Sequence, residues 1–539
     1  MATDTSTRVS SSTAPRIGTS APRPDGVPKV LGKFAFSSDL WDEHMLWGAT
    51  LRSPHASARI TSIDISAALA VPGVAAVLTA DDVPGNRFFG LDEPDQPVLA
   101  SEVVRHVGEP IAIVAADHPD TARRAADLIV VQYELLTPLS DPETAIDAPP
   151  IHPEGNVVRR LVVRHGDIDA VGEVQVEGTY EVGMQDQAFL GTESGLARPT
   201  GDGGVELLVS TQFLHSDHGQ VAACLGLEPD DVKLVLAGVG GAFGGREDVS
   251  LHIHLCMLAL HTGRPVKMIY SREESFYGHV HRHPARMWYR HHADRDGNLI
   301  KVECRLLFDG GAYRSSSAAV IANASCFAVG PYRVPNALVD GIVVRTNNPS
   351  CGAMRGFGAV QTCFAHEAQM DKLAAALGID PIELRLRNVL ATGDTLITGQ
   401  VITGAAPVAE VVRSLAALPL PDEPVTIDDP RELPGGTGRT TDHVDVRRGV
   451  GFALGFKNLC FSEGFDDYST ARVRVEAGVA TVTCACAEVG QGFVTLAQQI
   501  TREVLGVDDV LLAPADTRIG SAGSTSASRQ TWMSGGAVK

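Results

Sequence analysis

The 539-residue chain has room for roughly three to four domains, and 44% of its residues are hydrophobic, which suits a large buried core. Its formal net charge is −20, with 65 acidic residues against 45 basic ones. This balance argues against nucleic-acid binding and against electrostatic docking on an anionic membrane. The nine cysteines are scattered and form no CxxC pair, so we expect reduced thiols, a cytoplasmic protein and no iron–sulfur cluster on this chain.

The N-terminal residues 1–26 are rich in Ser, Thr, Pro and Gly and contain no apolar core of a signal peptide. We therefore expect them to form a disordered tail. No apolar run elsewhere approaches the ~20 residues that a membrane-spanning helix needs, so no membrane association is predicted.

Residues 27–140 are predicted to form a small α/β domain. A helix is expected over Asp120–Val130, with Asp120 as its N-cap. Strands are expected at Met45–Arg52, Arg59–Asp64, Val74–Leu78, Pro110–Ala115 and Val131–Leu136. The Pro-rich residues 141–160 are predicted to be a linker.

Residues 161–417 are predicted to form a second region, in which strand Val232–Leu236 leads through a glycine-rich loop into helix Val249–His261. A helix over Cys363–Leu377 is expected to end at Gly378, and Asp380 is expected to cap the next one. Residues 418–446, rich in Pro, Gly and Asp, are predicted to be a linker before a third region, 447–539. Together these patterns predict an α+β fold of several domains.

The glycine-rich loop Gly238–Glu247 reads GVGGAFGGRE. A strand, such a loop and a helix in succession suit anion binding, because exposed backbone N–H groups can approach a phosphate. A dinucleotide-binding fingerprint would need a third glycine where Phe243 stands, and a P-loop would need Lys and Ser or Thr where Arg246 and Glu247 stand. Taken alone, the loop is also compatible with an ordinary turn.

Four further motifs accompany this loop in a fixed order. The five motifs are SerThrGln at 210–212, GGAFGGRE at 240–247, PSCGAMRGFGAVQ at 349–361, EVGQG at 488–492 and TSASRQ at 525–530. With them the chain resembles the large molybdopterin-binding subunit of the xanthine dehydrogenase and aldehyde oxidase family. The resemblance covers nearly the whole chain. It implies an α/β hammerhead domain over 27–140, followed by an incomplete molybdenum-cofactor domain whose two lobes are 161–417 and 447–539.

The resemblance implies that molybdenum is held by the pterin dithiolene, with no metal ligand from the protein. It assigns the catalytic group to Gln212, Glu247 and Arg355, with Gln212 facing the apical oxo group. The pterin is either molybdopterin itself or its cytosine dinucleotide. The residues expected to bind the cofactor are Gln212, Gly241, Phe243, Gly244, Arg355, Val489, Gly490, Gln491, Thr525, Ser526, Ala527, Ser528 and Gln530.

Substrate preference is suggested by Glu247, because the purine-oxidising members of the family have an acid there, while the aldehyde-oxidising members have an apolar residue. An ordinary acid stabilised by a helix N-terminus is the alternative. Phe357 matches an aromatic residue that packs on the substrate ring. Asn323 stands where purine enzymes have an arginine, so another N-heterocycle or an aldehyde remains open. Gly356 replaces the cysteine of the carbon-monoxide dehydrogenase branch.

The implied reaction is hydroxylation of a purine such as hypoxanthine or xanthine, with water as the oxygen source. The electrons require partner subunits carrying [2Fe–2S] clusters and FAD, which predicts a hetero-oligomer that dimerises. The family's catalytic base is a glutamate in a C-terminal region beyond Lys539. Either a separate chain completes that region or the sequence is truncated. A cofactor-binding chain without its own activity is a further alternative.

Three histidines at two-residue spacing, His279, His281 and His283, would share one face of a strand and could ligate zinc. The sequence shows no matching cluster of Cys, Asp or Glu, so no metal site is predicted there. His252 and His254 are expected to be partly buried positions of an apolar helix.

Overall fold

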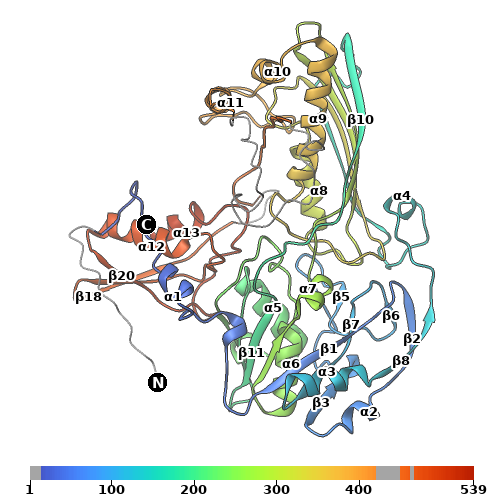
Figure 1. Cartoon of the computed structure of the whole chain (residues 1–539), viewed down its shortest axis with the longest axis vertical. Coiled ribbons are helices and arrows are strands. Elements are labelled where there is room, and N and C mark those ends of the chain that lie inside the picture. Colours follow the sequence, from blue (N-terminus) through green and yellow to red (C-terminus); the bar gives the residue numbers. More distant parts are fainter. Residues whose placement is uncertain (1–13, 421–448, 462–466) are drawn as a thin grey trace, which may run out of the picture.

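The computed structural model describes residues 14–420, 449–461 and 467–539. Figure 1 shows a lower part built around one large sheet, an upper part with long strands covered by helices on one face, and a smaller part that contains the C-terminus. The mixture of helices and strands in several units confirms the predicted α+β class.

The lower part is organised by a seven-stranded sheet in the order β13-β12-β11-β14-β1-β7-β3. Strand β1 pairs antiparallel with β7 and parallel with β14, so residues on both sides of the predicted 141–160 linker share this sheet. The predicted regions 27–140 and 161–417 therefore contribute strands to the same sheet. The strands are β1 (Leu46–Arg52), β3 (Val74–Leu78), β7 (Pro110–Ala116), β11 (Ser194–Pro199), β12 (Val205–Val209), β13 (Val232–Leu236) and β14 (Val266–Ile269).

Three helices pack on this sheet: α3 (Pro119–Asp127), α5 (Leu214–Leu225) and α6 (His252–Thr262). The predicted N-cap Asp120 is wrong, because His118 caps α3 and accepts the amide of Asp120 while Pro119 occupies the first turn. Helix α6 begins three residues later than predicted and is buried along most of its length, including His252 and His254. Its Leu255 and Leu258 belong to the core that the whole sheet shares.

Smaller elements surround this sheet. The 141–160 linker prediction is wrong in part, because the segment contains helix α4 (Pro142–Ala145) and the first residues of β9 (Val157–His165). A three-stranded sheet has the order β6-β2-β8, and β4 pairs with β5. The remaining elements here are β2 (Ala58–Asp64), β4 (Phe88–Phe89), β5 (Gln96–Pro97), β6 (Val103–Val104), β8 (Val130–Leu135), α2 (Ser66–Leu69), α7 (Arg272–Gly278) and the 3-10 turns η1 (Ser37–Asp39), η2 (Ala80–Asp82) and η3 (Pro229–Asp231).

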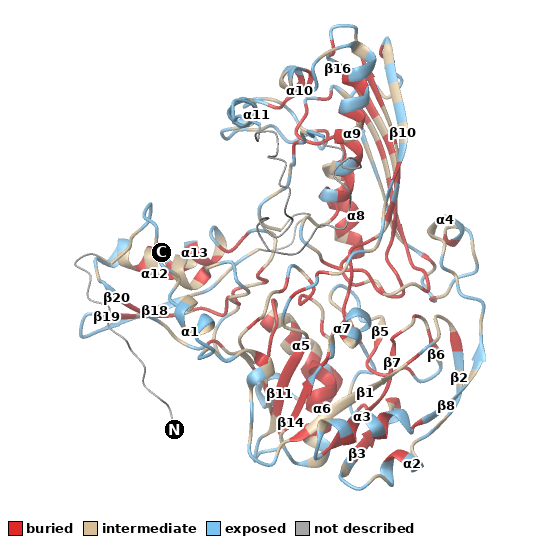
Figure 2. Cartoon of the chain, viewed as in Figure 1, coloured by how far each residue is buried: buried red, intermediate tan, exposed pale blue. Residues whose placement is uncertain are grey.

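The upper part is a five-stranded sheet in the order β10-β15-β16-β17-β9, with its own hydrophobic core. Helix α9 contacts β10 and β15, and Figure 2 shows its sheet-facing residues buried. As predicted, α9 ends at a left-handed Gly378 and Asp380 caps the next helix. The elements are β10 (Val174–Val182), β15 (Ala285–Ala293), β16 (Leu299–Asp309), β17 (Asn336–Val344), α8 (Ser317–Cys326), α9 (Ala359–Leu377), α10 (Pro381–Asn388) and α11 (Val408–Ala416).

The C-terminal part combines a sheet in the order β18-β19-β20 with two helices. It attaches to the outer edge of the seven-stranded sheet, where the amide of Leu236 donates to the carbonyl of Ala515 at 3.0 Å. Its Val482 and Phe493 belong to the core of the lower part. The elements are β18 (Arg472–Glu476), β19 (Val479–Thr483), β20 (Asp509–Leu512), α12 (Phe493–Leu505) and α13 (Met533–Val538). The predicted linker 418–446 lies outside the described residues, apart from its first three.

The N-terminal segment contacts the C-terminal part before helix α1 (Gly26–Val30) begins. Arg16 donates to the carbonyl of Arg502, and Arg23 donates to the carbonyl of Gly490 at 2.6 Å and forms an ion pair with Glu488. The predicted disordered tail is therefore wrong for residues 14–26, because two arginines tie this polar stretch down. Residues 1–13 of that prediction lie outside the described part.

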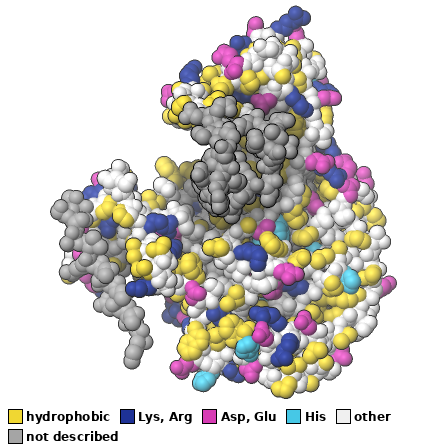
Figure 3. All heavy atoms as spheres, viewed as in Figure 1, with side chains coloured by type: hydrophobic (Ala, Val, Ile, Leu, Met, Phe, Trp, Pro, Cys, Tyr) yellow, Lys and Arg dark blue, Asp and Glu magenta, His cyan; other side chains and the backbone are white. Residues whose placement is uncertain are grey.

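The surface drawn in Figure 3 mixes acidic and basic side chains without a basic stripe. Within the described part of the chain, no helix is both long enough and apolar enough to cross a membrane. All nine cysteines lie in the described part of the chain, and no disulfide joins them.

Candidate active site

The glycine-rich loop joins β13 to α6 and contacts the AMRGFG segment, 353–358. Gly241, Phe243 and Gly244 all have left-handed backbone, with φ of 99°, 53° and 107°. A Cβ on Gly244 would lie 2.6 Å from the carbonyl oxygen of Ala353, so only glycine allows this approach. The amide of Arg355 donates to the carbonyl of Phe243 at 2.8 Å. The two motifs are therefore held together by backbone contacts.

Gln212, which follows β12, is 4% exposed and connects two motifs. Its Oε1 accepts the amides of Gly244 and Arg246 at 3.1 and 3.3 Å. Its Nε2 donates to the carbonyl of Thr525 at 2.6 Å. The amide of Thr525 donates back to the Gln212 carbonyl at 2.9 Å. In this structure Gln212 thus holds the glycine-rich loop against the TSASRQ segment.

The TSASRQ segment, 525–530, is a tight loop. Ala527 and Ser528 are consecutive left-handed residues with φ of 48° and 50°. Thr525 Oγ1 donates to the carbonyl of Ala487 at 2.9 Å, and Gln530 Nε2 donates to the carbonyl of Ser524 at 2.8 Å. The first of these bonds joins the loop to the segment that precedes α12.

The EVGQG segment, 488–492, folds on itself immediately before α12. Gln491 Oε1 accepts the amide of Val489 at 2.8 Å, and its Nε2 donates to the carbonyl of Ala487 at 2.9 Å. Glu488 accepts the amides of Gly490 and Gly492 at 2.8 and 3.1 Å. Ala487 thus accepts from both Gln491 and the TSASRQ loop, so all five sequence motifs form one connected set.

Two predicted substrate residues lie on the side of the five-stranded sheet. Phe357 has left-handed backbone with φ of 46° and packs against the core of that sheet. Gly358 follows, and a Cβ there would lie 2.3 Å from the carbonyl oxygen of Val320 on α8. Asn323 is buried on the same helix. Asn323 thus lies on α8, and Phe357 precedes a glycine that packs against the same helix.

Backbone strain is concentrated in these motifs. Nine non-glycine residues have left-handed φ in the part of the chain that the structure describes, and four of them are Phe243, Phe357, Ala527 and Ser528. Such conformations cost of order 1–3 kcal/mol each and tend to occur at functional sites. The motifs chosen from sequence are thus also the places where the backbone is most constrained.

Family models match almost all of the chain. The aldehyde oxidase and xanthine dehydrogenase a/b hammerhead domain matches residues 31–137. Molybdopterin cofactor-binding domains match residues 151–389 and 433–539. A probable xanthine dehydrogenase subunit of Bacillus subtilis is 34% identical over 520 residues, which cover 95% of this chain and 68% of that protein. The chain belongs to the xanthine dehydrogenase and aldehyde oxidase family.

Other members of the family show how the chain compares in length. The nicotinate dehydrogenase large molybdopterin subunit of Eubacterium barkeri is 39% identical over 401 residues, 74% of this chain and 94% of that subunit. The structure of aldehyde oxidoreductase from Desulfovibrio gigas superposes with a TM-score of 0.85 at 30% identity, covering 97% of this chain and 59% of that one. The family, the hammerhead domain and the molybdopterin-binding domains predicted from sequence are confirmed.

The residues of the site fit a molybdopterin cofactor. Within the described residues, the amides of Gly241, Phe243, Gln491 and Ser526 donate to no protein acceptor. A Cβ on Gly490 would meet nothing within 4 Å, so this glycine leaves open space beside Gln491. Unpaired amides beside open space suit the oxygens of a pterin and its phosphate. The role of each predicted residue stays a prediction.

Glu247 is the last residue of the glycine-rich loop and has 8% of its surface exposed. Its Oε1 accepts a hydrogen bond from Ser524 Oγ at 3.2 Å. Burial raises the pKa of Glu247 to about 7, and burial likewise raises the pKa of the neighbouring Asp248 to about 6. The alternative of a helix N-terminal acid is not supported, because α6 begins only at His252.

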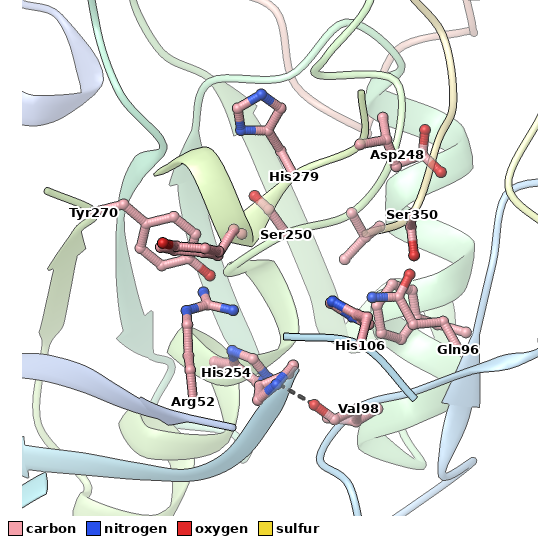
Figure 4. Close-up of a pocket in the computed structure, with 16 residues that line it drawn as sticks. Arg52, Gln96, Val98, His106, Asp248, Ser250, His254, Tyr270, His279 and Ser350 are labelled. Carbon is pink, nitrogen blue, oxygen red and sulfur yellow. Dashed lines mark hydrogen bonds between the residues drawn. The ribbon is translucent and has the colours of Figure 1, made fainter. Parts of the chain in front are cut away.

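An enclosed pocket lies next to Asp248, between β1, α6 and α7, and is also lined by His106, His254 and Tyr270. Figure 4 shows Arg52 and His254 on one side of it and Asp248 on the other. Burial lowers the pKa of His254 to about 4, so this imidazole is neutral and donates from Nε2 to the carbonyl of Val98 at 2.8 Å. The pocket is therefore polar, but His254 adds no charge to it.

Sequence reasoning missed Gln187, Glu488 and the N-terminal arginine Arg23. Gln187 Nε2 donates to the carbonyl of Ala353 at 2.8 Å and so holds the first residue of the AMRGFG segment. Glu488 caps the EVGQG turn and pairs with Arg23. Glu488 lies inside a recognised motif and could have been found there, whereas Gln187 and Arg23 stand in no motif.

Proposed function

We propose that this chain is the molybdenum-cofactor subunit of a hydroxylase that oxidises a purine, hypoxanthine or xanthine, with water as the oxygen source. When bound, the cofactor would supply the two-electron oxidant. The chain's own part is to hold that group between the motif loops and to orient a flat, electron-poor ring beside it. The observation that carries the purine assignment is the buried carboxyl of Glu247.

Glu247 suits an N-heterocycle because its pKa of about 7 lets the carboxyl exist in both protonation states near neutral pH. The protonated form can donate a hydrogen bond to a ring nitrogen and the ionised form can accept one from a ring N–H. An aldehyde offers one acceptor and no ring N–H, so it gains less from such a group. Relatives named for xanthine, nicotinate and nicotine support the class of N-heterocycles.

Asn323 weakens the case for xanthine itself, because it carries no charge to stabilise a negative ring. A relative named aldehyde oxidoreductase, 31% identical over 551 residues, keeps an aldehyde or another N-heterocycle as the second candidate. A test is the pair of Glu247→Ala and Glu273→Ala, the latter an exposed glutamate on α7. We expect Glu247→Ala to lower kcat/KM for xanthine at least tenfold more than for an aldehyde, and Glu273→Ala to change neither. Equal losses for both substrates would contradict the purine assignment.

The electrons need acceptors outside this chain. No disulfide joins the cysteines, and the one group suited to a metal within the described residues contains no cysteine. We therefore propose partner subunits with [2Fe–2S] clusters and FAD, assembled as a dimerised hetero-oligomer in the cytoplasm. Pull-down of the chain from its own cells, followed by measurement of iron and flavin, tests this. Recovery of the chain alone, without iron or flavin, would count against it.

The competing function is a cofactor-binding chain without activity of its own. If residues 1–539 with cofactor and redox partners hydroxylate xanthine, that alternative is ruled out.

A further inference from the structure

The histidine run predicted from sequence is split by the structure. His279 and His281, which follow α7, approach Asp186 from the loop between β10 and β11. Asp186 Oδ2 lies 3.0 Å from His279 Nε2 and 3.4 Å from His281 Nε2. His283 instead contacts Ser317 Oγ at 2.8 Å. The expectation that no acidic residue joins this run is wrong.

We propose that Asp186, His279 and His281 bind a divalent transition-metal ion, with zinc as the best fit, at a structural site separate from the molybdenum cofactor. Metal–ligand bonds of about 2.0–2.1 Å in a tetrahedron place neighbouring ligand atoms about 3.4 Å apart. The three ligand atoms here lie within 4.8 Å of one another. Gln187 Oε1, 3.1 Å from His279 Nε2, offers a fourth oxygen.

The far side of His279 independently supports a metal. Its Nδ1 lies 3.0 Å from Oε1 of Glu193, a carboxylate that is 2% exposed. Neither oxygen of Glu193 has a hydrogen-bond partner apart from this ion pair in the described residues. A buried carboxylate on the second ring nitrogen is the arrangement that orients metal-bound histidines. Without a metal ion, the Glu193 carboxylate would only form an ion pair with a buried histidine.

The geometry of Asp186 also leaves one oxygen for an ion. Its Oδ1 accepts the amide of Ala188 at 2.6 Å, while its Oδ2 faces the two histidines. The stacked imidazoles of His279 and His281, with ring centroids 5.1 Å apart, present both Nε2 atoms to the same side. His279 also lines the polar pocket, and Figure 4 shows its ring turned away from Arg52 and His254.

A metal at this site would also support the cofactor loops, because Gln187 Nε2 donates to the carbonyl of Ala353 at 2.8 Å. The ion would thus fix the segment that contacts AMRGFG.

The test measures zinc and molybdenum separately by plasma mass spectrometry on the full-length protein after dialysis. We expect about one zinc per chain in the wild type, and loss of that zinc in Asp186→Asn and His281→Asn. Glu193→Gln should bind zinc ten- to hundredfold more weakly, as expected when a supporting carboxylate is removed. His283→Asn, from the same run, is the matched control and should keep its zinc. Wild-type zinc content in both ligand variants would overturn the proposal.

A second measurement does not depend on the variants folding. Wild-type protein stripped with a chelator is titrated with zinc chloride and with cobalt chloride. We expect zinc to raise the melting temperature and cobalt to produce visible absorption bands of a site with nitrogen ligands. If the stripped protein takes up neither metal and melts at the same temperature with and without zinc, Asp186, His279 and Glu193 form only an ion-paired group and the proposal is wrong.

Discussion

Glu247 is the residue whose chemistry depends most on burial. The ordinary pKa of 4.5 rises to about 7, so in the folded state the proton is bound more tightly than in the unfolded chain. The stability that this raised pKa contributes is fully present when the pH is below the pKa of Glu247 in the unfolded chain. It is lost as the pH rises through the folded-state pKa of about 7. Ionisation of the buried Glu247 carboxyl therefore lowers the free energy of unfolding at alkaline pH.

Glu247→Gln is expected to remove that cost, since the amide stays neutral. In cofactor-free protein, the variant and the wild type should have similar unfolding free energies at pH 5. The variant should become more stable by up to about 3 kcal/mol at pH 9. Chemical denaturation at both values measures this, with the exposed Glu273→Gln as control. A difference that does not change with pH would contradict the raised pKa.

At Gly244 the close contact with the backbone of Ala353 leaves no room for a side chain. Gly244→Ala would combine a φ of 107° with a Cβ 2.6 Å from the Ala353 carbonyl oxygen. The loop has to move, so we expect the affinity for the molybdenum cofactor to fall about five- to 150-fold, since strain of about 1–3 kcal/mol corresponds to that range. Gly399→Ala has a similar φ of 87° but open space, and it should retain its molybdenum. Equal molybdenum content in the two variants would show that the contact is unimportant.

At the scale of elements, helix α10 is held to α9 by a buried ion pair. Arg385 is fully buried, and its Nε lies 2.9 Å from Oε2 of Glu367. Glu367 also accepts the hydroxyl of Tyr332 at 2.5 Å and the amide of Leu454 at 2.8 Å. The Leu454 contact fastens the segment that leads into the C-terminal part, so this pair organises three elements.

Arg385→Ala should therefore lower the free energy of unfolding by about 3 kcal/mol, because the buried carboxylate of Glu367 loses its arginine partner. Arg387, two residues on, forms an exposed i,i+4 pair with Glu383 at 3.0 Å. Arg387→Ala is the control, and a loss of about 0.5 kcal/mol or less is expected. Comparable losses for both, measured by denaturant titration, would refute the importance of burial.

At the scale of the whole molecule, the hammerhead segment and the glycine-loop region share one core. Ile113 of β7 and Leu255 of α6 both belong to it, as does Phe493 of the C-terminal part. The five-stranded sheet has a separate core. Two smaller clusters lie within the hammerhead segment. Because the segment also contributes to the larger shared core, we infer that it unfolds together with the glycine-loop region.

Calorimetry can test this. Ile113→Ala and Leu255→Ala each create a cavity that should cost about 2–5 kcal/mol. Both should shift the same unfolding transition to lower temperature. Tyr289→Leu, in the core of the five-stranded sheet, serves as the comparison and should shift a different transition if the two cores unfold separately. A hammerhead transition that only Ile113→Ala moves would contradict the shared core.

Much of the local structure followed from sequence. The strand at Pro110–Ala116, the cap at Asp380 and the left-handed Gly378 depend on neighbouring residues, so hydrophobic pattern and capping chemistry sufficed to predict them. The His118 cap was missed because a histidine seldom fills that position. The pairing of β1 with β14 was missed because it joins segments that no local pattern connects.

The sequence by itself determined the family, the order of the five motifs and the set of residues predicted to bind the cofactor. It could do so because the spacing of motifs is a property of the chain. Only the tertiary structure decided what those residues touch. Gln212 meets Thr525 across 313 positions and Glu247 meets Ser524 across 277. The same packing set Asp186 against His279 and buried Glu247 deeply enough to raise its pKa. Such contacts depend on how sheets and loops pack, and burial exists only once that packing is complete.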